Sequence, residues 1–330
     1  MAYDVALQDD HGTGSFDDLA KKTFLSNVVR AFVRSLRAAD FVSMAPISGK
    51  TSEDYIRIVP EVTPEIHDPN AEIAGQTLEK TVGTVRIEDK ETIAAVYLSK
   101  RDALISHYDE KGETAFACGY SLAKQVDEHV LRQLIVAAQT SASGNFKGGQ
   151  SVSETGTFAT IFGITTPSVT ASKLLQTAIQ KLDLQFYQDD VPENEQKVIF
   201  CRPDIKLALR QDDTLMSRDF TSPMFANKEL GTLTMVEGHP VIPTNAFPRS
   251  SFTAVTTGPT KQGTYVYIPD ASKVAMVVAS RQALKGVMAE GVTVTIDWIP
   301  VRRSWLCTAA IMKGLDTYRP ECAGIVVSSA

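Results

Sequence analysis

The sequence predicts an α+β protein whose helices and strands are segregated along the chain. Apolar side chains recur at helical spacing through residues 109–140, which predicts a helix of about 30 residues. Strand patterns follow later, mainly between 273 and 312. No internal repeat is visible. This order implies that the end of the chain returns to pack on its beginning.

The composition is that of an ordinary globular protein, with 330 residues, 43% hydrophobic and 22% charged. This is enough chain for a sizeable core in one large domain or two smaller ones. The net charge of −6 is opposite in sign to that of a dedicated nucleic-acid binder. No apolar stretch approaches the roughly 20 residues that span a bilayer, and no signal peptide is visible. We therefore expect no membrane partner.

Cysteine and histidine positions predict neither disulfides nor a metal site. The cysteines at 118, 201, 307 and 322 include no pair two residues apart, so we expect reduced, buried thiols. The five histidines are scattered without the spacing of zinc ligands. We accordingly expect no metal and no cofactor.

The first predicted element is a helix that begins near Ser15, which is a plausible N-cap. A stripe of three arginines, Arg30, Arg34 and Arg37, is predicted on the face opposite the apolar residues. The simplest interpretation of this stripe is a solvated face, and the alternative is a contact surface for an acidic chain or for phosphate. The predicted apolar face consists of Phe24, Leu25, Val28, Val29, Phe32, Val33 and Leu36.

A long β-hairpin is predicted next, with strands at 53–62 and 77–98. The segment between them, 60–75, contains three prolines and four acidic residues, which predicts an irregular acidic tip. Two strands alone are marginally stable in water, so this hairpin needs another surface to lie on.

The remaining elements alternate between helix and strand. The Gly-, Ser- and Thr-rich stretch 141–166 is predicted to be a long loop, and loops of that length usually contact something else. After it we expect helices at 167–185 and 203–210, strands at 197–201, 273–278, 292–299 and 305–312, and a strand and turn at 235–248.

No motif forms a catalytic constellation, so the chain is not expected to be an enzyme. SGKT at 48–51 resembles the end of a phosphate-binding loop, but Met44 stands where glycine is required and a strand follows, so we predict a turn. Gly119-Tyr120-Ser121 lacks the strand–turn–helix context of a nucleophile elbow. The paired carboxylates at 189–190 and 212–213 lie in polar loops and are expected to be solvated.

Several segments, taken in order, resemble the major capsid protein of tailed bacteriophages, which has the Hong Kong 97-type fold. The resemblance is closest to short-tailed, T-seven-like podoviruses and runs from about residue 24 to 327. It rests on ISGKTSEDYIRI (47–58), YLSKRDALISHYDEKGETAFACGYSLAKQVDEHVLRQLI (97–135), VPENEQKVIFCRPDIKLAL (191–209), GHPVIPTNAFP (238–248) and the closing Arg319-Pro320-Glu321-Cys322-Ala323-Gly324.

The resemblance implies a division of the chain into four parts. These are an N-terminal arm (1–50), an extended loop (51–90), a peripheral domain with a long spine helix (91–166 and 284–330) and an axial domain (167–283). It also implies hexamers and pentamers that close an icosahedral shell around double-stranded DNA. The implied partners are the chain itself, a scaffolding protein, a portal protein, a decoration protein and, weakly and without specificity, the packaged DNA. The implied location is the virion, after assembly in the host bacterial cytoplasm.

Complementary charge on two segments that both need partners motivates a hypothesis about subunit contacts. Arg30, Arg34 and Arg37 would pair across subunits with the tip acids Glu61, Glu65, Asp68 and Glu72. DNA phosphate or a scaffolding protein is the rival partner of the arginines. Three other functions remain open: an encapsulin-type compartment shell, a nucleotide-binding enzyme that uses Lys50, and a globular adaptor.

Overall fold

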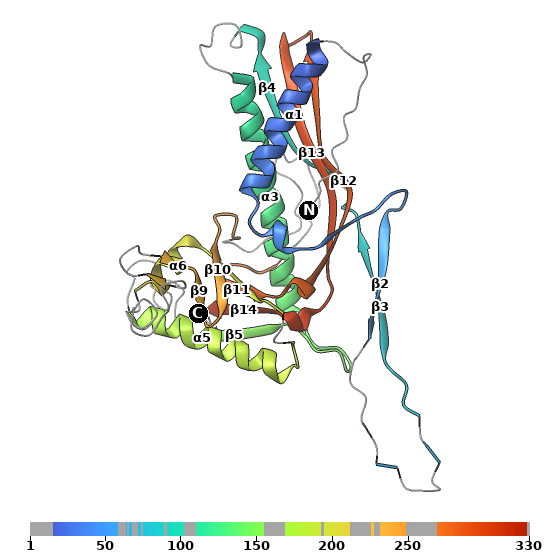
Figure 1. Ribbon diagram of the computed structural model, residues 1–330, viewed down its shortest axis with the longest axis vertical. Helices are drawn as coiled ribbons and strands as arrows, with labels where there is room; N and C mark the ends of the chain where they lie inside the picture. Colours follow the sequence, from blue (N-terminus) through green and yellow to red (C-terminus); the bar gives the residue numbers. More distant parts are fainter. Residues whose placement is uncertain are drawn as a thin grey trace.

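The molecule has an elongated body from which a β-hairpin projects on one side (Figure 1). The predicted α+β fold class is confirmed, with two larger sheets and several helices. This computed structural model describes residues 16–58, 64, 66–67, 72–73, 75–88, 91–101, 110–154, 169–192, 195–211, 226–227, 232–248 and 269–328.

Two long helices, α1 (Phe16–Ser35) and α3 (Glu110–Gln139), pack against each other in the upper part of the body (Figure 1). Both were predicted from apolar spacing, and the 30 residues of α3 make a rod of about 45 Å. Gly119 allows the close approach, because a Cβ atom there would lie 2.4 Å from the carbonyl oxygen of Val28.

The predicted pattern of α1 is wrong at two points. Val33 was assigned to the apolar core face, but it is 48% exposed. Arg37 lies beyond the end of the helix and so cannot belong to a helical stripe. The helix ends because the backbone N–H groups of Arg37, Ala38 and Ala39 donate to the buried carboxylate of Asp127, at 2.9, 3.0 and 2.8 Å.

The two helices cover one face of a four-stranded sheet with the order β1-β12-β13-β4. Alternate residues of β13, Cys307, Ala309 and Ile311, are buried, whereas the residues between them are half-buried. The long strands exceed the predicted ranges, since pairing between β12 and β13 continues to Leu284 and Thr317. The bounds are β1 Met44–Pro46, β4 Thr92–Ser99, β12 Leu284–Ile299 and β13 Ser304–Thr317.

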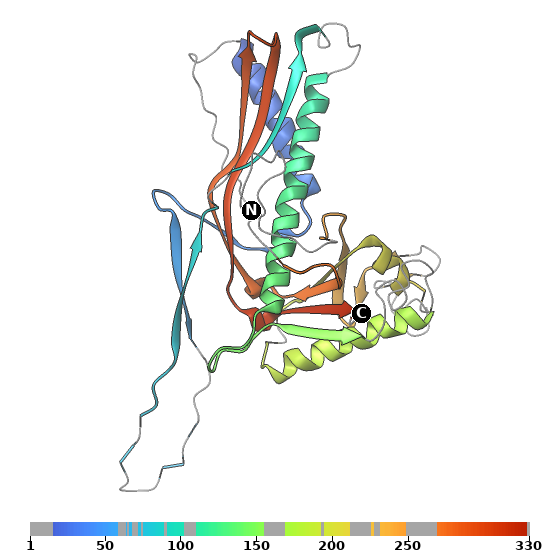
Figure 2. The same cartoon turned by 180° about the vertical axis from the view of Figure 1, so that it is seen from behind.

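A six-stranded sheet forms the lower part of the body, with the order β5-β14-β11-β6-β10-β9 (Figure 2). Helices α5 (Val169–Gln188) and α3 contact it, and α6 (Pro203–Leu209) packs on α5 and β10. Its strands are β5 Gln150–Glu154, β6 Val198–Cys201, β9 Met235–Val236, β10 His239–Pro243, β11 Val274–Ala279 and β14 Ala323–Ser328.

Strand β5 lies within the stretch predicted to be a loop. Its residues are polar except for Val152, so no alternating apolar pattern marks it in the sequence. It forms the edge of the sheet and pairs in parallel with β14. Residues 155–168 lie outside the described part of the chain. The sheet thus combines strands from two of the predicted parts, and the four-part division stays a prediction.

The hairpin consists of β2 (Ser52–Ile58) and β3 (Lys80–Arg86), paired antiparallel from Ser52–Arg86 to Ile58–Lys80. The prediction of a single strand over 77–98 is wrong. After β3 the chain turns into the body, where Glu88 is buried, and β4 then joins the four-stranded sheet. Alternation of residue types alone does not show this change of sheet.

Smaller elements complete the described chain. The two short strands β7 (Ala226–Asn227) and β8 (Thr232–Leu233) pair with each other, and three single turns of 3-10 helix occur at Ala39–Phe41, Arg281–Ala283 and Pro320–Cys322. All four cysteines are buried and unbonded, as predicted. No helix in the described ranges is long and apolar enough to span a membrane.

Candidate subunit-contact surfaces

The motifs that resemble catalytic sequences occupy structural positions. Gly49, at a φ of +70°, lies in the loop before β2, so SGKT forms a turn that leads into a strand, as predicted. Ser121 lies inside α3, where its hydroxyl donates to the carbonyl oxygen of Cys118 at 3.1 Å. Among the described residues, no group of three or more His, Cys, Asp or Glu side chains could hold a metal ion.

In one of the two carboxylate pairs that were predicted to be solvated, only one side chain is fully exposed to water. The side chain of Asp190 is 91% exposed, whereas Asp189 lies 3.6 Å from the ammonium group of Lys147 and accepts a hydrogen bond from Gln150. This corrects the prediction for Asp189. The other pair, at 212–213, lies outside the described residues.

The root of the hairpin is held to the body by Tyr55. Its hydroxyl donates to the carbonyl oxygen of Thr317 at 2.7 Å and lies 3.2 Å from the carboxylate of Asp316. Burial raises the pKa of Tyr55, and the charge of Asp316 raises it further, so the phenol stays a donor. Gly83, opposite Tyr55, leaves room for the ring, because a Cβ atom there would lie 2.2 Å from it.

Two ion pairs on the same face of β2 reinforce this root. Arg57 pairs with Glu321 at 2.6 Å, and its guanidinium group also lies over the ring of Phe146. Lys285 pairs with Glu53 at 2.9 Å. Since alternate residues of a strand point to one side, Glu53, Tyr55 and Arg57 all face the body.

The opposite side of the hairpin carries three exposed apolar residues. Ile56 and Val82 face each other across the two strands and are 61% and 65% exposed, and Ile58 is 44% exposed. We call these three residues the hairpin outer face. An exposed patch of adjacent apolar side chains is typical of a surface that contacts another protein.

A buried cluster of charged side chains lies where the hairpin re-enters the body. The ammonium group of Lys313, on β13, donates to the carboxylate of Glu88 at 2.9 Å and lies 2.8 Å from Nδ1 of His129, on α3. On the same helix, the buried side chain of Arg132 pairs with Glu128. The cluster joins the hairpin exit, the long helix and the long strand.

The charge states of this cluster follow from its surroundings. Hydrogen bonds and the positive charge of Lys313 outweigh burial and lower the pKa of Glu88 to about 2, so it is ionised. Burial, and then the charge of Lys313, lower the pKa of His129. His129 is therefore neutral near pH 7, and its Nδ1 lies within hydrogen-bond distance of the ammonium group of Lys313. The cluster therefore contains an ionised pair beside a neutral imidazole.

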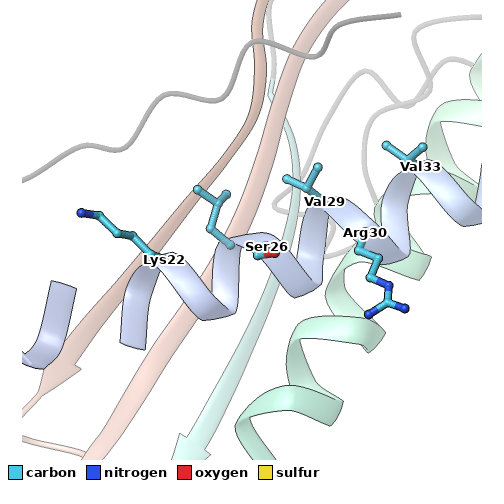
Figure 3. A pocket seen from close by; sticks show the side chains of 6 residues that line it. Lys22, Ser26, Val29, Arg30 and Val33 are labelled. Carbon is cyan, nitrogen blue, oxygen red and sulfur yellow. The ribbon is translucent and has the colours of Figure 1, made fainter. Parts of the chain in front are cut away.

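The outward side of α1 carries a shallow groove of about 410 Å³. In Figure 3, Val29 and Val33 point to the same side of the helix, and Lys22, Ser26 and Arg30 flank them. Val33 is 48% exposed and Val29 is half-buried. We call Val29 and Val33, with these three flanking residues, the α1 groove.

The structure describes four of the seven residues that were predicted to form subunit contacts. Arg30, Arg34 and Arg37 are exposed, although only the first two lie on α1. Glu72 is exposed near the hairpin tip. The other three predicted acids, Glu61, Glu65 and Asp68, lie outside the described residues.

Sequence reasoning missed the residues that position the hairpin. Glu88, His129 and Lys313 are 41 residues or more apart in sequence, so no local spacing brings them together. The one usable signal was the ionisable residue Lys313 in an apolar strand pattern, AAIMKGL. A charge in a buried strand predicts a buried partner.

A comparison with known families identifies the chain. The sequence profile of the Gp10A-like family, described as major capsid proteins, matches residues 56–327. No curated protein sequence matches the chain significantly.

Solved structures agree with this family at the level of the fold. The capsid structure of the cyanophage P-SCSP1u has a TM-score of 0.74 at 20% identity, covering 89% of this chain and 88% of that one. The mature capsid of bacteriophage PhiM1 has a TM-score of 0.70 at 17% identity, covering 89% and 87%. A virus-like particle from Pyrococcus furiosus is less similar, with a TM-score of 0.52 at 11% identity, covering 93% and 99%.

These findings decide between the alternatives left open by the sequence. The predicted Hong Kong 97-type capsid fold is confirmed, and the encapsulin-type shell is not favoured. A turn that leads into a strand gives no support to a nucleotide-binding enzyme at Lys50. Because the family profile covers most of its length and the fold is that of phage capsids, the chain belongs to the Gp10A-like family of major capsid proteins.

Proposed function

We propose that this capsid protein assembles as hexamers and pentamers into the icosahedral shell of a podovirus-type tailed phage, around its double-stranded DNA. The observation that carries the proposal is the hairpin, which is fixed at its root by Tyr55 and Arg57 but exposes Ile56, Ile58 and Val82. A hairpin with such a face is stabilised by a neighbouring subunit, because two strands alone are marginally stable.

The proposed role is structural and includes no catalytic step. In this proposal a scaffolding protein guides assembly in the host bacterial cytoplasm, a portal protein occupies one vertex, and a decoration protein can bind the finished shell in the virion. The net charge of −6 per chain makes the shell negative overall, so we propose weak, non-specific contact with DNA. A strongly basic inner face in the assembled shell would contradict this last point.

In this proposal each of the four parts makes a different contact in the assembly. The arm (1–50) and the extended loop (51–90) would contact neighbouring subunits. The axial domain (167–283) would meet its copies around the five-fold and six-fold axes. The peripheral domain (91–166 and 284–330) would connect capsomers through the edge of the long sheet.

Electron microscopy of the purified full-length chain tests the proposal. We expect capsomers or closed shells, with a larger yield of uniform shells when the scaffolding protein is co-expressed. Shells isolated from infected cells should protect double-stranded DNA from nuclease. A chain that sediments as a monomer at all concentrations, with or without scaffold, would overturn the proposed function.

A further inference from the structure

We propose that Glu88, Lys313 and His129 form a proton-sensitive latch, which holds the hairpin exit on β13 while His129 is neutral and releases it when the imidazole takes up a proton. The hairpin exit consists of Ile87 and Glu88, which follow β3. The latch belongs to the single subunit, so it goes beyond the proposed assembly and can fail while that function stands.

The hairpin exit lies at the edge of β13, beside Lys313. The backbone N–H of Glu88 donates to the carbonyl oxygen of Lys313 at 2.9 Å, and that of Ile87 donates to the carbonyl oxygen of Thr51 at 3.0 Å. Strand β4 pairs with β13 only as far as Ile311, so it does not hold the exit. The carboxylate of Glu88 reaches the ammonium group of Lys313, also at 2.9 Å. The exit is therefore held to one residue of β13 through both backbone and side chain.

His129 completes this contact from α3. Its Nδ1 atom lies 2.8 Å from the ammonium group of Lys313 and 3.5 Å from the carboxylate of Glu88. Its Nε2 atom lies 3.0 Å from the side-chain amide of Gln125, which carries no charge. The side chains of His129, Glu88 and Lys313 are all nearly inaccessible to water. A change in the charge of the imidazole therefore cannot be screened by solvent while the contact is closed.

Uptake of a proton by His129 leaves this site with one uncompensated positive charge. Within the described residues, the charged groups around the imidazole are two cations and two carboxylates from three elements: Lys313 on β13, Arg132 and Glu128 on α3, and Glu88 at the hairpin exit. The new proton on Nδ1 would face the ammonium group of Lys313. An uncompensated buried charge is strongly unfavourable, so the protonated imidazole favours an arrangement that admits water.

The hairpin exit is the part of this contact that can move without opening the core. Helix α3 and strand β13 belong to the main buried cluster, through residues such as Val130 and Ile311. Ile87 packs instead on a separate cluster of only three buried residues, Ile47, Val85 and Val287. Release of the exit therefore exposes little apolar surface, and it brings the imidazole and the carboxylate of Glu88 into water.

Hydrogen exchange in the full-length, unassembled subunit tests the latch. After correction for the intrinsic effect of pH, the amides of Ile87 and Glu88 should exchange at least roughly tenfold faster at pH 5 than at pH 7, because the open form binds a proton that the closed form excludes. The amides of β6, in the buried sheet, should exchange equally at the two pH values.

Two histidine variants form a matched pair for this measurement. Glutamine takes up no proton, so in His129→Gln the corrected exchange of the exit amides should differ by less than about twofold between the two pH values. His239 also lies beside a carboxylate, 2.9 Å from Asp183, but it belongs to β10 and is not part of the cluster. His239→Gln should therefore keep the full change at the exit.

Pulsed electron spin resonance measures the direction of the hairpin independently. Spin labels on Val82→Cys and Val301→Cys, two exposed positions, report the distance between the hairpin and the far end of the long sheet. The four native cysteines are buried, so labelling of them should be low. The distance distribution should be broader or shifted at pH 5 compared with pH 7. With His129→Gln added, it should be the same at both.

Each contrary result has a separate meaning. Exit amides that exchange equally at both pH values, or with equal pH dependence in the native chain and in His129→Gln, would overturn the latch and leave the proposed assembly in place. Equal acceleration in β6 would show unfolding of the whole subunit, which also contradicts a local latch.

The native chain is sufficient for the test if His129→Gln does not fold. Exchange at the exit should begin to rise below pH 6.5, where an ordinary histidine takes up its proton. A rise that begins only near pH 4.5, the ordinary value for glutamate, would assign the effect to Glu88 and overturn the role of His129.

Discussion

The six-stranded sheet and the β2–β3 hairpin use similar apolar residues in opposite ways. Every residue of β6 and β11 is buried within the subunit. In the hairpin, Ile56, Ile58 and Val82 are exposed, and contact with the body is made by the polar face of β2 and by Val85 of β3, which packs on Ile47 and Val287. The sheet therefore stabilises the subunit, whereas the apolar face of the hairpin remains available for contacts between copies. Four experiments test this difference.

The largest expected effect is at the junction between the two regions, in Lys313→Met. Removing the ammonium group leaves the ionised Glu88 buried without its partner. We expect the free energy of unfolding to fall by about 3–5 kcal/mol. Chemical denaturation of the unassembled subunit measures this change in the free energy of unfolding.

A double variant controls for lost packing. Lys313→Met with Glu88→Leu removes both charges, so it should recover most of the loss caused by the single change. A single variant that unfolds at the same denaturant concentration as the native chain would show that the ion pair contributes nothing to stability.

A matched pair of isoleucines compares the two regions directly. Ile199, on β6, is completely buried, so Ile199→Ala should lower the free energy of unfolding by about 2–5 kcal/mol. Ile56→Ala, on the hairpin outer face, should change it by less than about 0.5 kcal/mol. The same Ile56 variant should nevertheless reduce particle yield in sedimentation. Equal losses of subunit stability in both variants would contradict the comparison.

Acidification should weaken the junction before it affects the rest of the hairpin. The pKa of His129 is lower in the folded chain than its ordinary 6.5, so its stabilising effect is present above pH 6.5 and is lost as the pH falls below it. Glu88 adds a second loss as the pH falls from 4.5 toward its folded value of about 2. We expect the free energy of unfolding to fall as the pH is lowered from 7 to 5. His129→Gln should flatten that part of the stability curve measured by denaturation, and an unchanged curve would contradict the assignment of a neutral imidazole.

A small, local effect is expected for Tyr55→Phe, which removes the hydroxyl that binds Thr317. The loss should be about 1 kcal/mol. This loss of stability should be confined to the hairpin, because the hairpin contributes little to the subunit core. Hydrogen exchange should quicken at the amides of β2 and β3 and stay unchanged in β6. Tyr120→Phe, at an exposed position on α3, is the control.

Much of this architecture was predictable because it depends on local periodicity. The spacing of apolar residues gave α1 and α3 within one or two residues at most ends. The turn at Gly49 and the buried strand Val198–Cys201 also followed from short-range pattern. Such elements are visible in sequence because each residue type repeats with the geometry of the element.

The features that failed depend on partners far away in the chain. β5 is polar, and it becomes a strand because β14 pairs with it from more than 160 residues later. The split of the predicted strand 77–98 depends on Glu88 reaching Lys313, and Arg37 leaves the helix because Asp127 takes its N–H group. The predicted contact surface stays a prediction, and local pattern places its arginines only in part. Arg30 and Arg34 follow helical spacing, but the exposure of Val33 depends on how α1 lies on α3.

The polar root of the hairpin also acts mechanically. The seven residues of β2 span about 24 Å, and the tip extends further. Ile58 lies three residues, or about 10 Å, beyond Tyr55, so a rotation of about 10° at Tyr55 would move the far end of β2 by about 2 Å and residues beyond it by more. The root is thus the pivot of a lever, and the few bonds there set where a distant tip meets its neighbour. A small change of angle at the root therefore produces a larger displacement at the tip, and this displacement affects the angle between neighbouring subunits in the proposed assembly.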